Sequence, residues 1–174
     1  MATPQGAPDR SVSAGVIKFV NLSLAIVSSA GAVGVLAFPE HPVLIALSVP
    51  FFLFLCALVH EGGHALACLV CGREIRRLRV LFFCASPEGI QISDRLSLQC
   101  CCTFSNPKGS KNWRIYLAGP VFSLLLAMGL QYLYLRFPSP ALYVYTLLAW
   151  FIVSTNLLPL RGNDILMILK EIGK

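Results

Sequence analysis

Two histidines and a glutamate lie inside a stretch of the sequence that is otherwise apolar. They belong to the pentapeptide His-Glu-Gly-Gly-His, His60 to His64, within an apolar block that runs from Val43 to about Cys71. A charged side chain near the centre of a membrane helix costs about 2.5–3.5 kcal/mol on insertion scales. Ionisable side chains that are retained at such a place indicate a functional site.

The spacing of these residues predicts a metal site. Residues i and i+4 share one face of an α-helix, about 6 Å apart along its axis. His60 and His64 placed in this way can bind one Zn²⁺, and Glu61 between them can take a proton from water that the metal activates. The alternative is a polar cluster that only packs helices together.

A catalytic zinc needs a third protein ligand and an open position. Asp164 is the only acid within residues 141–170, and it follows the last apolar block. His60 lies about 26 Å past Val43 along a helix. It is therefore near the membrane face that the fourth span also reaches, where Asp164 lies. A proline and a glycine just before Asp164 would end the helix and let the chain fold back. Asp164 is therefore a candidate ligand, the alternative being an ordinary acid at the membrane interface.

Four apolar blocks are long enough to cross a membrane, at residues 19–38, 43–71, 115–135 and 141–160. A span needs about 20 residues to cross a hydrocarbon core of about 30 Å. Of the 174 residues, 56% are hydrophobic and 13% are charged, against about 45–50% and about 25% in soluble domains. We expect an all-α polytopic membrane protein with a single domain over residues 1–174.

Basic residues are distributed unequally between the two sides that four spans would create. Thirteen Lys and Arg residues fall on the side that holds both termini and the long loop 72–114, and one, Arg136, falls on the other. Positive residues accumulate on the cytoplasmic side, so we expect a multi-pass protein of the cell membrane with both termini cytoplasmic. The basic loop is expected to contact anionic lipid, and no nucleic acid is needed to explain the net charge of +6.

The loop 72–114 also contains two runs of β-prone residues, 77–83 and 89–93, separated by a turn that includes Pro87 and is followed by Gly89. Two short β-prone runs joined by a tight turn are typical of a hairpin. The sequence therefore predicts a small β-hairpin at the cytoplasmic membrane surface.

Three motifs occur in an order that resembles one protease family. His-Glu-Gly-Gly-His lies in the second expected span, LAGPVFSLLLA (117–127) in the third, and NLLPLRGND (156–164) follows the fourth. Together they resemble the site-2 proteases, which are intramembrane zinc metalloproteases, over about residues 43–167. The chain departs from the usual pattern at Ser123, where the family usually has Asn, and at Ile165, where it usually has Gly.

The resemblance implies a role for each residue of the site. It implies one Zn²⁺ per chain, held by His60, His64 and Asp164, with Glu61 as the general base. It also implies that Asn156 faces the substrate or stabilises an oxyanion. The substrate would be a membrane-spanning or membrane-associated protein or peptide, cut near the cytoplasmic face. An exposed edge of the hairpin would hold an unwound substrate segment by strand addition, unless the hairpin only caps the helices.

Other functions remain open at this stage. A catalytically silent member of the family would bind membrane helices as a scaffold. A metal transporter is disfavoured, because one three-ligand site without a polar path makes no conduit. The seven cysteines include Cys68 and Cys71 and the run 100–102, which suggest a thiolate metal site or a redox pair. A zinc-ribbon site would need a second Cys-x-x-Cys. We therefore interpret the cysteines as free thiols or as small apolar residues that fill space between helices.

Overall fold

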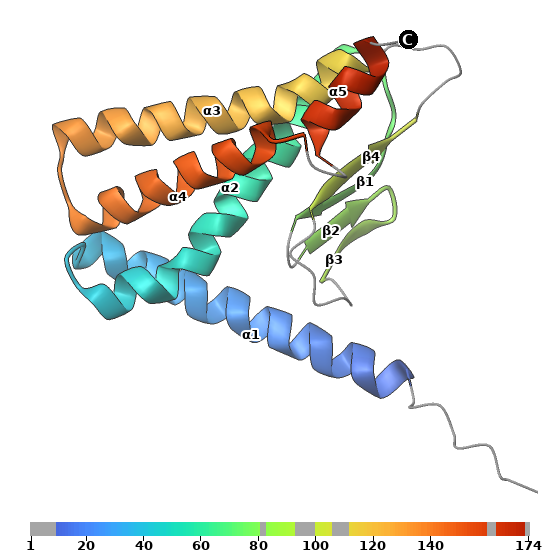
Figure 1. Ribbon diagram of the computed structural model, residues 1–174. Helices are drawn as coiled ribbons and strands as arrows, with labels where there is room; N and C mark the ends of the chain where they lie inside the picture. Colours follow the sequence, from blue (N-terminus) through green and yellow to red (C-terminus); the bar gives the residue numbers. More distant parts are fainter. Residues whose placement is uncertain (1–9, 81–82, 93–99, 106–111, 160–162, 173–174) are drawn as a thin grey trace, which may run out of the picture.

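In the described part of the computed structural model, four helices are long and apolar enough to cross a membrane (Figure 1). They are α1 (Arg10–Ala37), α2 (Pro42–Val70), α3 (Trp113–Arg136) and α4 (Pro140–Leu157). The structure describes residues 10–80, 83–92, 100–105, 112–159 and 163–172. The four expected spans are thus present as helices that could cross a membrane, and the predicted end of the fourth, residue 160, lies outside the described residues. A short fifth helix, α5 (Asp164–Ile172), was not expected from the sequence.

The helices pack through a small core and turn most of their large apolar side chains outward. Helix α2 packs on both α1 and α3, and α4 lies along α3 (Figure 1). One core cluster joins α2, α3 and α4 through Phe52, Cys56, Ala127, Ala149 and Val153. Leu36 is 86% exposed and Phe151 is 66% exposed. Helices with an apolar exterior and small residues at their contacts are typical of membrane bundles, and the chain is a multi-pass membrane protein.

A glycine just after the end of α2 turns the chain toward the sheet. Gly72 has a φ of 65°, which a residue without a Cβ adopts at little cost. Its N–H donates to the carbonyl of Leu69 at 3.0 Å, and the N–H of Arg73 donates to the carbonyl of Cys68 at 2.7 Å. This pair of bonds is a Schellman motif. It places the first strand immediately after the helix that carries both histidines.

A four-stranded antiparallel sheet follows α2 in the chain. Its strands are β1 (Ile75–Val80), β2 (Phe83–Ser86), β3 (Gly89–Ile92) and β4 (Cys101–Phe104), in the spatial order β3-β2-β1-β4. The predicted hairpin is present as β2 and β3, but it is only half of the sheet. The run 77–83, expected to be one strand, is divided between β1 and β2, which pair with each other through Val80 and Phe83.

The fourth strand makes the sheet larger than the predicted hairpin. Strand β4 comes from the cysteine run and pairs with β1 through Leu78 and Cys102 and through Arg79 and Cys101. Without β4, one row of β1 backbone groups would have no strand partner, and pairing with β4 satisfies them. Strand β4 also packs against α2. In the described part of the chain it has a strand neighbour on one edge only.

Candidate metal centre

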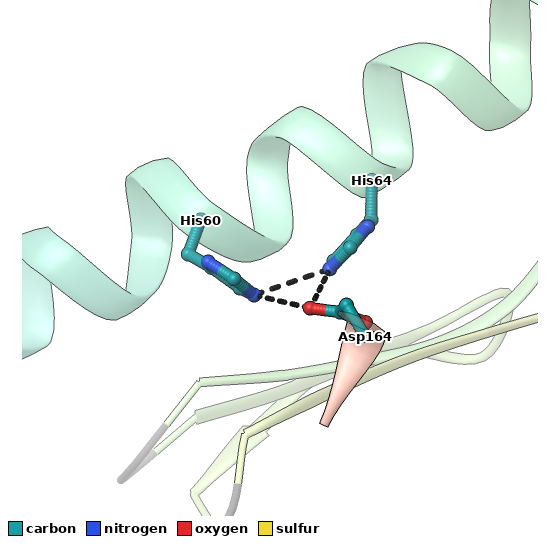
Figure 2. Close-up of side chains that lie close together, drawn as sticks. All are labelled: His60, His64 and Asp164. Atoms are coloured by element: carbon teal, nitrogen blue, oxygen red, sulfur yellow. Dashed lines mark hydrogen bonds and ion pairs between the residues drawn. The ribbon is translucent and has the colours of Figure 1, made fainter. Parts of the chain in front are cut away.

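His60 and His64 lie one turn apart on α2 and point to the same side, where they meet Asp164 (Figure 2). Asp164 is the first residue of α5, about a hundred residues further along the chain. Its Oδ2 lies 3.0 Å from Nε2 of His60 and 3.2 Å from Nε2 of His64. The two Nε2 atoms are 3.2 Å apart. Among the described residues, these three form the one cluster of three or more potential metal ligands.

The geometry of the three donor atoms fits zinc. Zinc binds imidazole nitrogen and carboxylate oxygen at about 2.0–2.2 Å with tetrahedral angles, so neighbouring donors should lie about 3.3 Å apart. The separations of 3.0, 3.2 and 3.2 Å are close to that value. Three protein ligands would leave the fourth position of a tetrahedron open, as catalytic zinc sites do.

Helix α3 contacts both histidines at their Nδ1 atoms and also passes close to their Nε2 atoms. Nδ1–H of His64 donates to the backbone carbonyl of Ile115 at 2.6 Å. Nδ1 of His60 lies 2.9 Å from Oγ of Ser123. A Cβ on Gly119 would lie 2.8 Å from Nε2 of His60 and even closer to the ring of His64. Glycine at this position therefore keeps the space beside both Nε2 atoms free.

Asp164 owes its position to two contacts of the segment that carries it. The side-chain nitrogen of Asn163 donates to the carbonyls of Thr155 at 2.9 Å and Leu158 at 3.2 Å, which folds the chain back beside the end of α4. At the other end of α5, Oε2 of Glu171 accepts the backbone N–H of Asn112 at 2.6 Å. Sequence reasoning expected a break here but missed the role of Asn163.

The ionisation of Asp164 suits a metal ligand. Burial raises the pKa of this carboxyl, but the hydrogen bonds with His60 and His64 outweigh burial and lower the pKa to about 2. The carboxylate is therefore ionised throughout the physiological range. An ionised carboxylate between two imidazoles supplies the negative charge that a divalent cation needs.

Glu61 is buried beside the two histidines, with 5% of its surface exposed. The backbone of Cys102 in β4 hydrogen-bonds its carboxylate. Its Oε2 atom has no hydrogen-bond partner among the described residues. A buried carboxylate oxygen without a partner is costly, so its position next to the potential zinc ligands needs a functional explanation.

All five predicted site residues line one cavity of about 680 Å³. Asn156, in the last turn of α4, reaches it and has its Nδ2 3.4 Å from Nδ1 of His60. Strand β4 forms another wall through Cys101, Cys102 and Phe104. The wall from β4 was missed by sequence reasoning, because the cysteine run has no strand signal of its own.

Among the described residues, the cysteines do not gather into a metal-ligand cluster. All seven are free, and none belongs to a group of three potential ligands in the described residues. Burial raises the pKa of Cys102 to about 12 and also raises the pKa of Cys101. Burial therefore disfavours the ionised thiolate of these two cysteines, which is the form that binds zinc.

Comparison with known proteins gives one match. A family model described as Peptidase M50B-like matches residues 26–161, most of the chain. The match includes both histidines, Glu61, the Gly-Pro pair of α3 and Asn156, and it ends three residues before Asp164. No curated protein and no solved structure matches.

Proposed function

The chain belongs to the peptidase M50B-like family, that of the site-2 proteases, and from this membership we propose that it is an intramembrane zinc metalloprotease. It hydrolyses a peptide bond of a membrane-embedded or membrane-adjacent protein near the cytoplasmic face. The observation that carries the proposal is the convergence of His60, His64 and Asp164 within 3.2 Å of one another, with Glu61 buried on the same cavity.

The five predicted site residues would each have a part in the reaction. Zinc held by the three ligands would polarise the scissile carbonyl and lower the pKa of a bound water. Oε2 of Glu61, which has no hydrogen-bond partner among the described residues, takes the proton of the attacking water. Glu61 then passes that proton to the leaving nitrogen. Asn156 lies next to His60, where its amide N–H can donate to the oxygen on which negative charge develops.

Strand β4 is the element that would hold the substrate. A membrane helix hides its backbone amides, so a segment must unwind before it can be cut. Residues Cys101–Phe104 line the cavity wall or adjoin it, and their outer edge carries no strand in the described residues. An extended peptide that added to that edge would pass beside Glu61 and His60. Backbone hydrogen bonds to β4 would keep the peptide in its extended conformation.

The test compares wild type with Glu61→Gln, which keeps the size of the side chain but cannot accept the proton. New peptide termini are quantified by mass spectrometry in membranes from cells that express each protein. Loss of a general base costs about 10²–10⁴-fold in rate, so the variant should bind zinc and accumulate uncut substrate. Glu74→Gln, which neutralises an exposed acid outside the cavity, should cleave normally.

This experiment also separates the protease from a helix-binding scaffold. Undiminished cleavage by Glu61→Gln would show that Glu61 is not the general base. Full biological activity of that variant, with no cleavage product in either sample, would favour the scaffold.

A further inference from the structure

Helix α3 presents three positions to the histidine pair, and they lie at intervals of four residues. Ile115 provides a carbonyl to His64, Gly119 leaves the space beside both Nε2 atoms free, and Ser123 provides a hydroxyl to His60. Residues i, i+4 and i+8 follow one face of a helix. One face of α3 therefore determines how both imidazoles are held.

A histidine that binds zinc through Nε2 must carry its proton on Nδ1, and that proton needs an acceptor. The carbonyl of Ile115 can only accept, so it holds His64 in this form at 2.6 Å. Two groups lie near Nδ1 of His60, namely Oγ of Ser123 at 2.9 Å and Nδ2 of Asn156 at 3.4 Å. An amide nitrogen can only donate, so the hydroxyl is the acceptor.

From this arrangement we infer that Ser123 is a positioning residue that orients His60 toward the metal by accepting its Nδ1–H. The inference rests on the proposed zinc site and adds a residue to it. Ser123 is 5% exposed and does not line the cavity, so it acts on the histidine and not on the substrate. The anchor of His64 is the backbone carbonyl of Ile115, which a substitution cannot remove. The anchor of His60 is the side chain of Ser123, which a substitution can remove.

The experiment measures zinc affinity of the purified full-length chain by competition with a chelator. Loss of a partner that orients a metal-bound histidine typically weakens binding about 10–100-fold, and we expect Ser123→Ala to fall in that range. The matched control is Ser48→Ala. Ser48 is also a buried helix serine, but its hydroxyl contacts the carbonyl of Ile45 and Tyr145, so this variant should bind zinc as wild type does.

A spectroscopic measurement separates positioning from a general effect on the fold. The chain has three histidines, so ¹⁵N labelling of their rings gives few signals. In the zinc-loaded wild type, His60 and His64 should each show an Nδ1–H that exchanges slowly with water. Ser123→Ala at saturating zinc should lose the protection of His60 alone, and Ser48→Ala should lose neither.

The possible outcomes are distinct. If wild type holds no zinc, the proposed function fails along with this inference. If wild type holds zinc and Ser123→Ala binds it equally well, only the inference fails. A weaker affinity with His60 still protected, or an equal loss in Ser48→Ala, would assign Ser123 a packing role and overturn the inference.

Discussion

At the scale of single residues, the site depends on a position that has no side chain. Gly119 lies where α3 passes the two imidazoles, and an added methyl group would come within 2.8 Å of Nε2 of His60. Real Cβ atoms are essentially never found so close to another heavy atom. The ring atoms it would displace are the ones that must bind the metal.

Gly119→Ala should therefore weaken zinc binding by about 100-fold or more, beyond the range typical of a lost outer hydrogen bond. Zinc competition on the purified protein measures the change. Gly129→Ala is the matched control, because it lies on the same helix and nothing is within 4 Å of its added Cβ. Equal affinities in the two variants would mean that the rings can move aside and that α3 does not confine them.

At the scale of elements, the site requires that α5 be held in place. Asp164 begins this short helix, which is joined to α3 at its far end by Glu171. A carboxylate that accepts an N–H at the start of a helix gains from the helix dipole as well as from the hydrogen bond. Helix α5 is thus attached to the helix whose other positions orient the histidines.

Glu171→Gln should weaken zinc binding by up to about fivefold, because a charge-assisted hydrogen bond is worth roughly 1 kcal/mol more than a neutral one. The effect should be far smaller than that of Asp164→Ala, which removes a ligand. Both are measured by zinc competition, with Lys170→Gln, an exposed neighbour on α5, as the control. A Glu171→Gln protein with wild-type affinity would show that other contacts hold α5.

At the scale of the whole molecule, the sheet and α5 lie at one end of the helices and the turn between α3 and α4 at the other (Figure 1). Four candidate spans place the two ends on opposite sides of the membrane. The basic residues Arg76 and Arg77 of β1 are exposed at the sheet end. We propose that they contact anionic lipid headgroups there.

The charge distribution predicts the orientation of the molecule. A reporter fused after Lys174 should be cytoplasmic, and one inserted between Pro138 and Ser139 should be external. The reason is that thirteen basic residues lie on the side of the termini and one lies on the other side, and basic residues accumulate on the cytoplasmic side. A third reporter between Pro87 and Glu88, in the turn of the sheet, should agree with the C-terminal one. The opposite pattern would place the cavity near the external face and contradict the proposed cleavage side.

Much of this protein was readable from local patterns in the sequence. The four spans follow from runs of apolar residues, and the shared face of His60 and His64 follows from the helical repeat. The departure at Ser123 was visible as well, but not its meaning. Nothing in the sequence states that a hydroxyl on α3 lies 2.9 Å from Nδ1 of His60, since that distance depends on how α3 packs against α2.

The sequence by itself therefore determined the membrane class, the helical spans and the residues able to bind a metal, because hydropathy and helical spacing act over a few neighbouring residues. Only the tertiary structure decided that Asp164 meets the histidines, that β4 joins β1 and forms a cavity wall, and that Gly119 and Ser123 contact the rings. These contacts join residues far apart in the chain, and they exist because close helix packing and backbone pairing bring distant segments together.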